Sequence, residues 1–229
     1  STWRTLLVGT LGAGGKGYFV LDVTDPNAFL ETNASTLVKL DRTRSTEAGT
    51  TPNCALTTMS SAEKAACNKA TTEDKDIGNI TARPVLDDTN PMRTTQITRM
   101  NNNRWAVVMG NGYNSANQRP VLLVQYLDND PGGDATKNMQ LLRLPATTEF
   151  PGQGKAADNG LAAPRLVDIN GDGRPDIAYA GDNLGNMWKF DLTSIDDTKW
   201  GVAPFGAPCR SARRHRRRYG ARGKELPHM

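Results

Sequence analysis

Short oxygen-bearing side chains alternate along residues 168–176. Ca²⁺ takes six to eight oxygen ligands at roughly 2.3–2.6 Å in a flexible shell, and carboxylates this close repel one another unless a cation lies between them. Two intervening glycines, Gly171 and Gly173, allow the backbone to turn tightly. The spacing predicts a calcium site, and an ordinary polar turn between strands is the alternative. The predicted side-chain ligands are Asp168, Asn170, Asp172 and Asp176.

This stretch resembles the first nine positions of an EF-hand loop, with the backbone carbonyl of Arg174 as the seventh-position ligand. The twelfth position is Tyr179, where an EF-hand has a bidentate Glu. The residues that follow Asp176 have the β-branched and aromatic character of strands. We therefore expect a cation loop on a sheet, not a helix–loop–helix.

Three segments share one pattern: an apolar strand that ends in Gly, a polar turn, and a second strand. Hairpins with variable insertions are typical of a β-propeller, and a β-sandwich with long loops is the alternative. We expect an all-β fold. The strand pairs are Leu6–Gly9 with Tyr18–Val23, Trp105–Gly110 with Val121–Leu127, and Asp176–Gly181 with Met187–Leu192.

An insertion rich in Thr, Ala and charged residues separates the first two hairpins, from about Asn27 to Asp76. Within it, Ser60 and Glu63 have the spacing of a capping box and predict a short helix through about Lys69. Cys67 would lie on this helix, and a Cys54–Cys67 disulfide would suit an exported protein. Two unpaired thiols are the alternative.

Residues 209–229 differ from the rest in composition. They hold eight of the 28 Lys and Arg residues and one of the 24 acids, so residues 1–208 carry 20 bases and 23 acids. We expect this tail to be disordered, and attribute it to a reading-frame change or a cloning artefact, with a genuine basic arm as the alternative. The body therefore gives no reason to expect nucleic-acid binding.

Composition also argues against catalysis and membrane insertion. Both histidines, His215 and His228, lie in the tail, so the body has none for general-base work or zinc binding. No apolar run approaches the ~18 residues of a membrane span. A second acidic turn, Asp128 to Asp134, contains Pro and Gly typical of a surface loop, and we assign no cation to it.

The chain resembles the C-terminal propeller of the PilY/PilC family of type IV pilus-tip adhesins and assembly factors. The likeness covers residues 3 to 200, and its most specific part lies at the calcium loop and the hairpin behind it. The matching stretches are Gly17–Pro26, Gly110–Ser115, Asn159–Pro164, Val167–Asp176 and Ala180–Leu192.

The resemblance implies a modified, quinoprotein-like β-propeller over residues 1–208, exported to the bacterial surface or pilus tip, with outer-membrane association left open. It implies a calcium site on the loop ligands whose occupancy regulates pilus extension and retraction. Twitching motility, virulence, and attachment to host cells or abiotic surfaces would follow, with minor pilins at the pilus tip as partners.

Two departures from the family bear on this reading. The long N-terminal region of the family is absent, and after Trp200 the chain does not continue as the family does, so we expect an incomplete propeller. Two other functions compete with the adhesion and biogenesis module. One is a quinoprotein-type propeller enzyme, for which we find no constellation of site residues. The other is a structural surface domain that calcium only stiffens.

Overall fold

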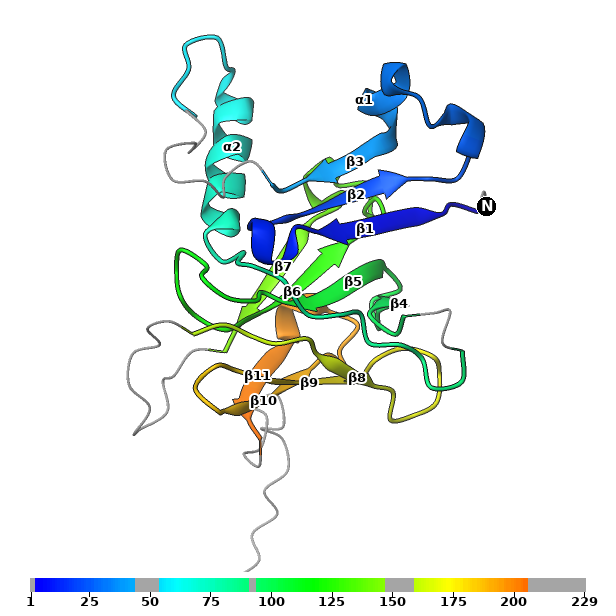
Figure 1. The fold of residues 1–229 in the computed structure, drawn as a ribbon, viewed down its shortest axis with the longest axis vertical. Coiled ribbons are helices and arrows are strands. Elements are labelled where there is room, and N and C mark those ends of the chain that lie inside the picture. The colour runs from blue at the N-terminus through cyan, green and yellow to red at the C-terminus, as the bar shows by residue number, and fades with distance from the viewer. Residues whose placement is uncertain (1–2, 44–53, 91–93, 147–158, 206–229) are drawn as a thin grey trace, which may run out of the picture.

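The computed structural model describes residues 3–43, 54–90, 94–146 and 159–205. In these residues the strands form three antiparallel sheets, each in sequence order (Figure 1). Sheet 1 contains β1 (Leu6–Thr10), β2 (Tyr18–Asp22) and β3 (Val38–Asp41). Sheet 2 contains β4 (Ile97–Arg99), β5 (Trp105–Gly110), β6 (Val121–Tyr126) and β7 (Leu141–Pro145). Sheet 3 contains β8 (Arg165–Val167), β9 (Ile177–Gly181), β10 (Met187–Asp191) and β11 (Gly201–Pro204).

Helices are few in the described residues. They comprise α1 (Ala34–Leu37), α2 (Ser61–Asp74) and five 3₁₀ turns, at Gly12–Gly14, Pro26–Ala28, Glu31–Asn33, Ala135–Lys137 and Asp197–Lys199. Across the described part of the chain, none of these helices has the length and apolar character needed to span a bilayer.

The three predicted hairpins are confirmed as β1–β2, β5–β6 and β9–β10, all antiparallel. The prediction of one long insertion between the first two hairpins is wrong in part. That stretch contributes β3, which pairs with β2 and is the third strand of sheet 1. β3 has only four residues and begins directly after α1, so its sequence carries little alternating pattern.

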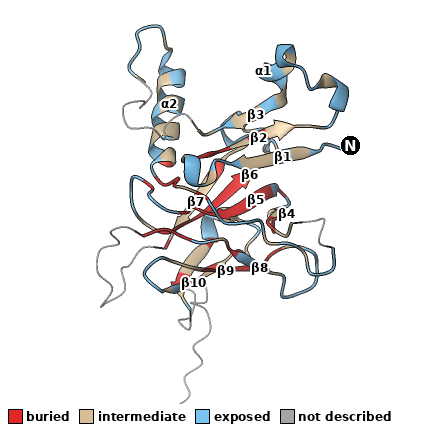
Figure 2. Ribbon diagram, viewed as in Figure 1, coloured by how far each residue is buried: buried red, intermediate tan, exposed pale blue. Residues whose placement is uncertain are grey.

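The sheets lie face to face, with sheet 2 in the middle (Figure 2). One face of sheet 2, which includes Val107 and Met109, packs on Tyr18 of sheet 1. The opposite face, which includes Val108 and Leu122, packs on sheet 3. Because both faces of sheet 2 are covered, β6 is buried along its whole length. This explains its continuous apolar run, in which the one polar residue, Gln125, accepts a hydrogen bond from the Tyr18 hydroxyl at 2.8 Å.

Two linking segments, residues 78–80 and 159–162, join the turns of neighbouring hairpins. In the first, the Asn79 side-chain amide donates to the carbonyl oxygens of Gly12 (3.1 Å) and Gly15 (2.9 Å) in the turn of sheet 1. The Asn79 backbone N–H donates to the carbonyl of Tyr113 (2.7 Å) in the turn of sheet 2. One asparagine thus ties sheets 1 and 2 together.

The second linking segment repeats this arrangement between sheets 2 and 3. The Gly112 N–H donates to the Leu161 carbonyl at 3.0 Å, and the Asn159 side-chain amide donates to Asp182 at 3.0 Å. Burial raises the pKa of Asp182, but hydrogen bonds from Asn186, Asn159 and Trp188 outweigh that effect and hold the pKa below its usual range. The carboxylate of Asp182 therefore stays charged at the junction.

Glycine is required where the linking segments meet the hairpin turns. A Cβ added at Gly160 would lie 1.8 Å from the carbonyl oxygen of Gly112, and one added at Gly110 would lie 2.0 Å from that of Ala162. The obstructing atoms belong to backbone, which cannot rotate away as a side chain can. The sheets thus approach each other here at backbone contact distance.

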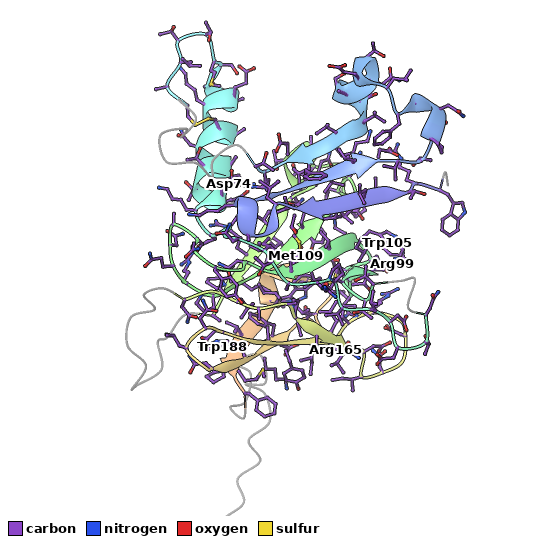
Figure 3. All side chains as sticks on the ribbon, viewed as in Figure 1. Asp74, Arg99, Trp105, Met109, Arg165 and Trp188 are labelled. Atoms are coloured by element: carbon purple, nitrogen blue, oxygen red, sulfur yellow. A yellow bond between two sulfur atoms is a disulfide. The ribbon has the colours of Figure 1, made fainter. Side chains whose placement is uncertain are left out.

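Helix α2 begins as predicted, with Ser60 and Glu63 forming a capping box. It extends beyond the predicted end at Lys69 to Asp74. The structure joins Cys54 and Cys67 in a disulfide, with their Cα atoms 5.5 Å apart, seen as a yellow bond beside α2 in Figure 3. At the other end of the helix, Arg42, the residue that follows β3, pairs with Glu73 and Asp74, each at 2.9 Å.

Asp76, just beyond α2, anchors the helix to sheet 2. Its fully buried carboxylate accepts hydrogen bonds from Arg119 at 2.8 Å on both oxygens and from Arg143 at 2.8 Å. Burial raises the pKa of Asp76, but the bonds, led by that from Arg119, outweigh it and hold the pKa below its usual range. The acidic end of α2 is therefore fixed to sheets 1 and 2 by ion pairs.

The predicted basic tail, residues 209–229, lies outside the described residues.

Candidate calcium site

The predicted cation loop connects β8 to β9 in sheet 3, as expected for a loop on a sheet. Gly171 and Gly173 have φ angles of 78° and 82°, in the left-handed region that favours glycine. These two residues let the chain coil on itself within the loop. The polar side chains of the loop therefore meet its own backbone N–H groups.

Asp168, at the start of the loop, is exposed to solvent. Both of its carboxylate oxygens nevertheless accept hydrogen bonds from the loop backbone. One accepts from the N–H of Gly171 and the other from that of Gly173, each at 2.7 Å. Desolvation raises the pKa of Asp168, but the N–H groups of Gly173 and Gly171 outweigh it and hold the pKa below its usual range. The carboxylate is therefore ionised at neutral pH, as a calcium ligand must be.

The middle of the loop repeats one local contact. Asn170 accepts a hydrogen bond from the N–H of Asp172 at 2.9 Å, and Asp172 accepts one from the N–H of Arg174 at 2.9 Å. Each side chain thus bonds to the backbone two residues ahead, as in an Asx turn. These contacts fix the path of the backbone through Arg174, whose carbonyl is the predicted seventh-position ligand.

Asp176, at the end of the loop, is buried, with 5% of its surface exposed. One oxygen accepts from the N–H of Ile169 at 2.9 Å, which closes the loop onto its own start. The other accepts from the side-chain amide of Asn101 at 3.2 Å. Asn101 lies between β4 and β5, so the loop of sheet 3 is tied to sheet 2.

The donor types suit a hard divalent cation: three carboxylates, one amide oxygen and one backbone carbonyl. An oxygen that accepts one N–H keeps a second lone-pair position for a metal. In the part of the chain that the structure describes, no three Asp, Glu, His or Cys side chains converge as a metal shell. The structure thus brings the predicted ligands into one loop but does not gather the carboxylates around one point.

A cavity of about 180 Å³ adjoins the loop at Asp168 and Arg174. Its other walls include Thr95 and Thr98, next to and within β4 of sheet 2. The loop offers five candidate ligands, fewer than the shell of Ca²⁺ requires. The cavity has room for the water molecules that would complete such a shell.

Two acids of the second acidic turn are paired with an arginine side chain. The Arg104 guanidinium lies 2.9 Å from Asp128 and 3.8 Å from Asp130, and it also donates to the carbonyl of Lys137 at 3.0 Å. It stacks on the ring of Tyr126 at 3.8 Å. Because a buried arginine already balances these acids, the turn is a poor site for a metal ion.

Asn101 was not identified from the sequence, because a single Asn in a short polar turn carries no signal of a distant partner. Its side-chain amide also donates to the carbonyls of Pro175 (3.1 Å) and Leu192 (2.9 Å). With 7% of Asn101 exposed, these bonds are shielded from water. Asn101 therefore positions the cation loop against the neighbouring sheet.

Replacing Asn101 with Ala is expected to lower the free energy of unfolding by about 1–3 kcal/mol, because buried acceptors lose their donor. Chemical denaturation measures the change. The control is Asn68→Ala on the exposed side of α2, expected to change stability by no more than about 0.5 kcal/mol. Equal stability of both variants would show that the contact with sheet 2 contributes nothing.

Comparisons with known proteins found a matching family model, similar proteins and a similar solved structure. A family model described as the PilY1 beta-propeller domain matches residues 64–212. Type IV pilus biogenesis factor PilY1 of Pseudomonas aeruginosa (strain UCBPP-PA14) is 33% identical over 208 residues, which cover 89% of this chain and 13% of that protein. A PilY1 homolog of Xylella fastidiosa (strain Temecula1 / ATCC 700964) is 30% identical over 88% of this chain and 11% of its own length.

The chain thus spans about an eighth or less of the length of these curated relatives. Among solved structures, the crystal structure of the Pseudomonas aeruginosa PilY1 C-terminal domain is 31% identical, with a TM-score of 0.49. That match covers 83% of this chain and 27% of the solved chain.

Proposed function

The chain belongs to the PilY1 β-propeller family, and from that premise we propose that it is the calcium-responsive part of a type IV pilus biogenesis factor. Its sheets are blades of an all-β propeller. The protein acts at the bacterial surface, where its partners are the minor pilins of the pilus tip and the host cell or abiotic surface to which the pilus attaches. We assign it no catalytic reaction.

The observation that carries this proposal is the oxygen-rich loop from Asp168 to Asp176 and its bond to Asn101. A bound calcium ion would draw the carboxylates toward itself and reorganise their contacts with the loop backbone. Because Asp176 bonds to both Ile169 and Asn101, such a change reaches the boundary between sheets 2 and 3. Calcium occupancy can thereby alter a surface formed by two blades.

In this proposal the two calcium states of the loop favour different states of the pilus machinery, and so regulate extension against retraction. Twitching motility and surface attachment depend on that balance. A purely structural calcium site would behave differently, because its loss would reduce the amount of folded protein without altering pilus behaviour at equal abundance.

The test is made in the full-length protein. Asp168→Ala is expected to change surface piliation and the width of the twitching zone while the protein is still exported at the normal level. Asp134→Ala, which removes a half-exposed carboxylate from the second acidic turn, is the matched control and should behave as wild type. Normal twitching and piliation in the Asp168→Ala strain would refute a regulatory role for the loop.

A further inference from the structure

Asparagine followed by glycine occurs three times in the chain, at Asn111, Asn159 and Asn170. This dipeptide can deamidate without an enzyme. The backbone nitrogen of the glycine attacks Cγ of the asparagine side chain, which closes a succinimide ring and releases ammonia. Glycine favours this step because it has no side chain to obstruct the ring and leaves the backbone free to adopt unusual conformations. The surroundings of each asparagine therefore decide which of the three sites reacts.

Asn111 is protected at the junction of sheets 1 and 2, where it is 0% exposed. Its side-chain amide donates to the carbonyls of Asp76 and Arg119, each at 2.8 Å. Its side-chain oxygen accepts from the N–H groups of Val121 at 3.1 Å and Leu161 at 2.9 Å. Attack on Cγ would break these bonds in a site that water does not reach, where a lost hydrogen bond is costly.

Asn159 is held in the same way at the junction of sheets 2 and 3, where it is 1% exposed. Its amide donates to Asp182 at 3.0 Å, and its oxygen accepts from the N–H groups of Gly160 at 2.8 Å and Asn183 at 3.0 Å. The space beside the glycines is also filled, because a Cβ added at Gly112 or Gly160 would lie 2.0 or 1.8 Å from a backbone oxygen. We therefore expect both buried sites to resist deamidation.

Asn170 differs from both, because it is exposed in the middle of the cation loop. Its oxygen accepts one bond, from the N–H of Asp172 at 2.9 Å, and among the described residues its amide nitrogen donates to no protein atom. A Cβ added at Gly171 would meet nothing within 4 Å. The attacking nitrogen of Gly171 donates to Asp168 at 2.7 Å, but that bond lies within the exposed loop and can open without disturbing a sheet.

We propose that Asn170 deamidates in the folded chain and that the products change how tightly the loop binds calcium. The second half of this proposal rests on the calcium site of the proposed function. Water opens the succinimide in two ways. Attack at Cγ breaks its bond to the Gly171 nitrogen and leaves aspartate. Attack at the backbone carbonyl breaks the other carbonyl–nitrogen bond and leaves isoaspartate. The net reaction consumes one water and releases one ammonia.

The two products have opposite effects on the loop. Residue 170 is at the third loop position, where the EF-hand pattern accepts either Asp or Asn. Aspartate leaves the backbone unchanged and raises the proposed carboxylate ligands from three to four, and calcium affinity is tuned by the charge of the ligands. Isoaspartate adds a methylene group to the main chain, so the regular spacing of the ligands is lost. An ageing population of the chain thus divides into tighter and weaker calcium-binding forms.

Peptide mapping by mass spectrometry tests the modification on the 229-residue chain, aged at neutral pH without calcium. The references are synthetic peptides of residues 108–115, 156–163 and 167–174, which report the unprotected rate at each site. Asn170 should deamidate in the chain within about tenfold of its peptide rate, and Asn111 and Asn159 at least about a hundredfold below theirs, because exposed loops open far more often than buried junctions. Protection of Asn170 as strong as that of the other two would overturn the proposal.

The variant Asn170→Asp supplies the aspartate product as a uniform protein. Titration calorimetry should give it a calcium Kd at least about threefold lower than that of wild type, because the loop gains a charged ligand. The matched control is Asn68→Asp on the exposed side of α2, which adds the same charge away from the loop and should leave the Kd unchanged. Equal Kd values in Asn170→Asp and wild type would overturn the effect on calcium. Failure of the proposed function would look different, because wild type would then bind no calcium while Asn170 still deamidated.

Discussion

Replacing Gly160 with Ala is expected to destabilise the chain by roughly 3 kcal/mol, the upper part of the usual range for overpacking a rigid site. The added methyl group would lie 1.8 Å from the carbonyl oxygen of Gly112. Relief requires that one linking segment move away from the hairpin turn of sheet 2. That movement breaks the bond from Gly112 to Leu161 and separates sheets 2 and 3. Denaturant unfolding followed by tryptophan fluorescence measures the change.

The matched control is Gly201→Ala in β11. A Cβ at Gly201 meets no atom within 4 Å, and its φ angle is not in the left-handed region. Its stability should therefore stay within about 0.5 kcal/mol of wild type. If the two alanine variants are equally stable, the linking segments do not hold the sheets at backbone contact.

The second large effect concerns calcium. An ion that binds only the folded chain raises its stability by about 2.7 kcal/mol when the free ion is at 100 times its Kd. Calcium at that excess is expected to raise the thermal midpoint of the wild-type chain. Asp168→Ala should lose most of this increase at the same calcium concentration, because it removes an exposed carboxylate that we propose as a ligand.

Magnesium provides a further comparison for the same loop. Mg²⁺ prefers a smaller octahedral shell and gives up water reluctantly, so it should raise the midpoint far less than calcium at equal concentration. An equal shift with both ions would indicate non-specific screening of acidic residues. The loop would then have no selectivity of the kind proposed.

The hairpins could be predicted from sequence because each strand is five or six residues long and is strongly apolar or aromatic. The remaining strands carry too little pattern. β4 and β8 have three residues each, and the burial of one face depends on a sheet that is distant in sequence. β3 is hidden in a stretch whose composition is that of a loop. Short strands of this kind are defined by their neighbours.

The ligand types of the loop could likewise be predicted, because the oxygen side chains recur at fixed spacing. The supports around it could not. Asn101 precedes Asp176 by 75 residues, and nothing local to either residue indicates the contact. Arg104 balances Asp128 across 24 residues, which only the β5–β6 hairpin brings together. The first contact follows from how two neighbouring sheets pack, and the second from how one hairpin folds.

Titration calorimetry with calcium on the wild-type chain, Asp168→Ala and Asp134→Ala tests the central claim most directly. Asp168 is the better target than Asp176, whose buried carboxylate also supports the fold. The account predicts saturable binding of one ion to wild type, a Kd at least tenfold weaker in Asp168→Ala, and an unchanged Kd in Asp134→Ala. The same calcium affinity in all three proteins would mean that the loop is only a turn, and the calcium-responsive function would fall with it.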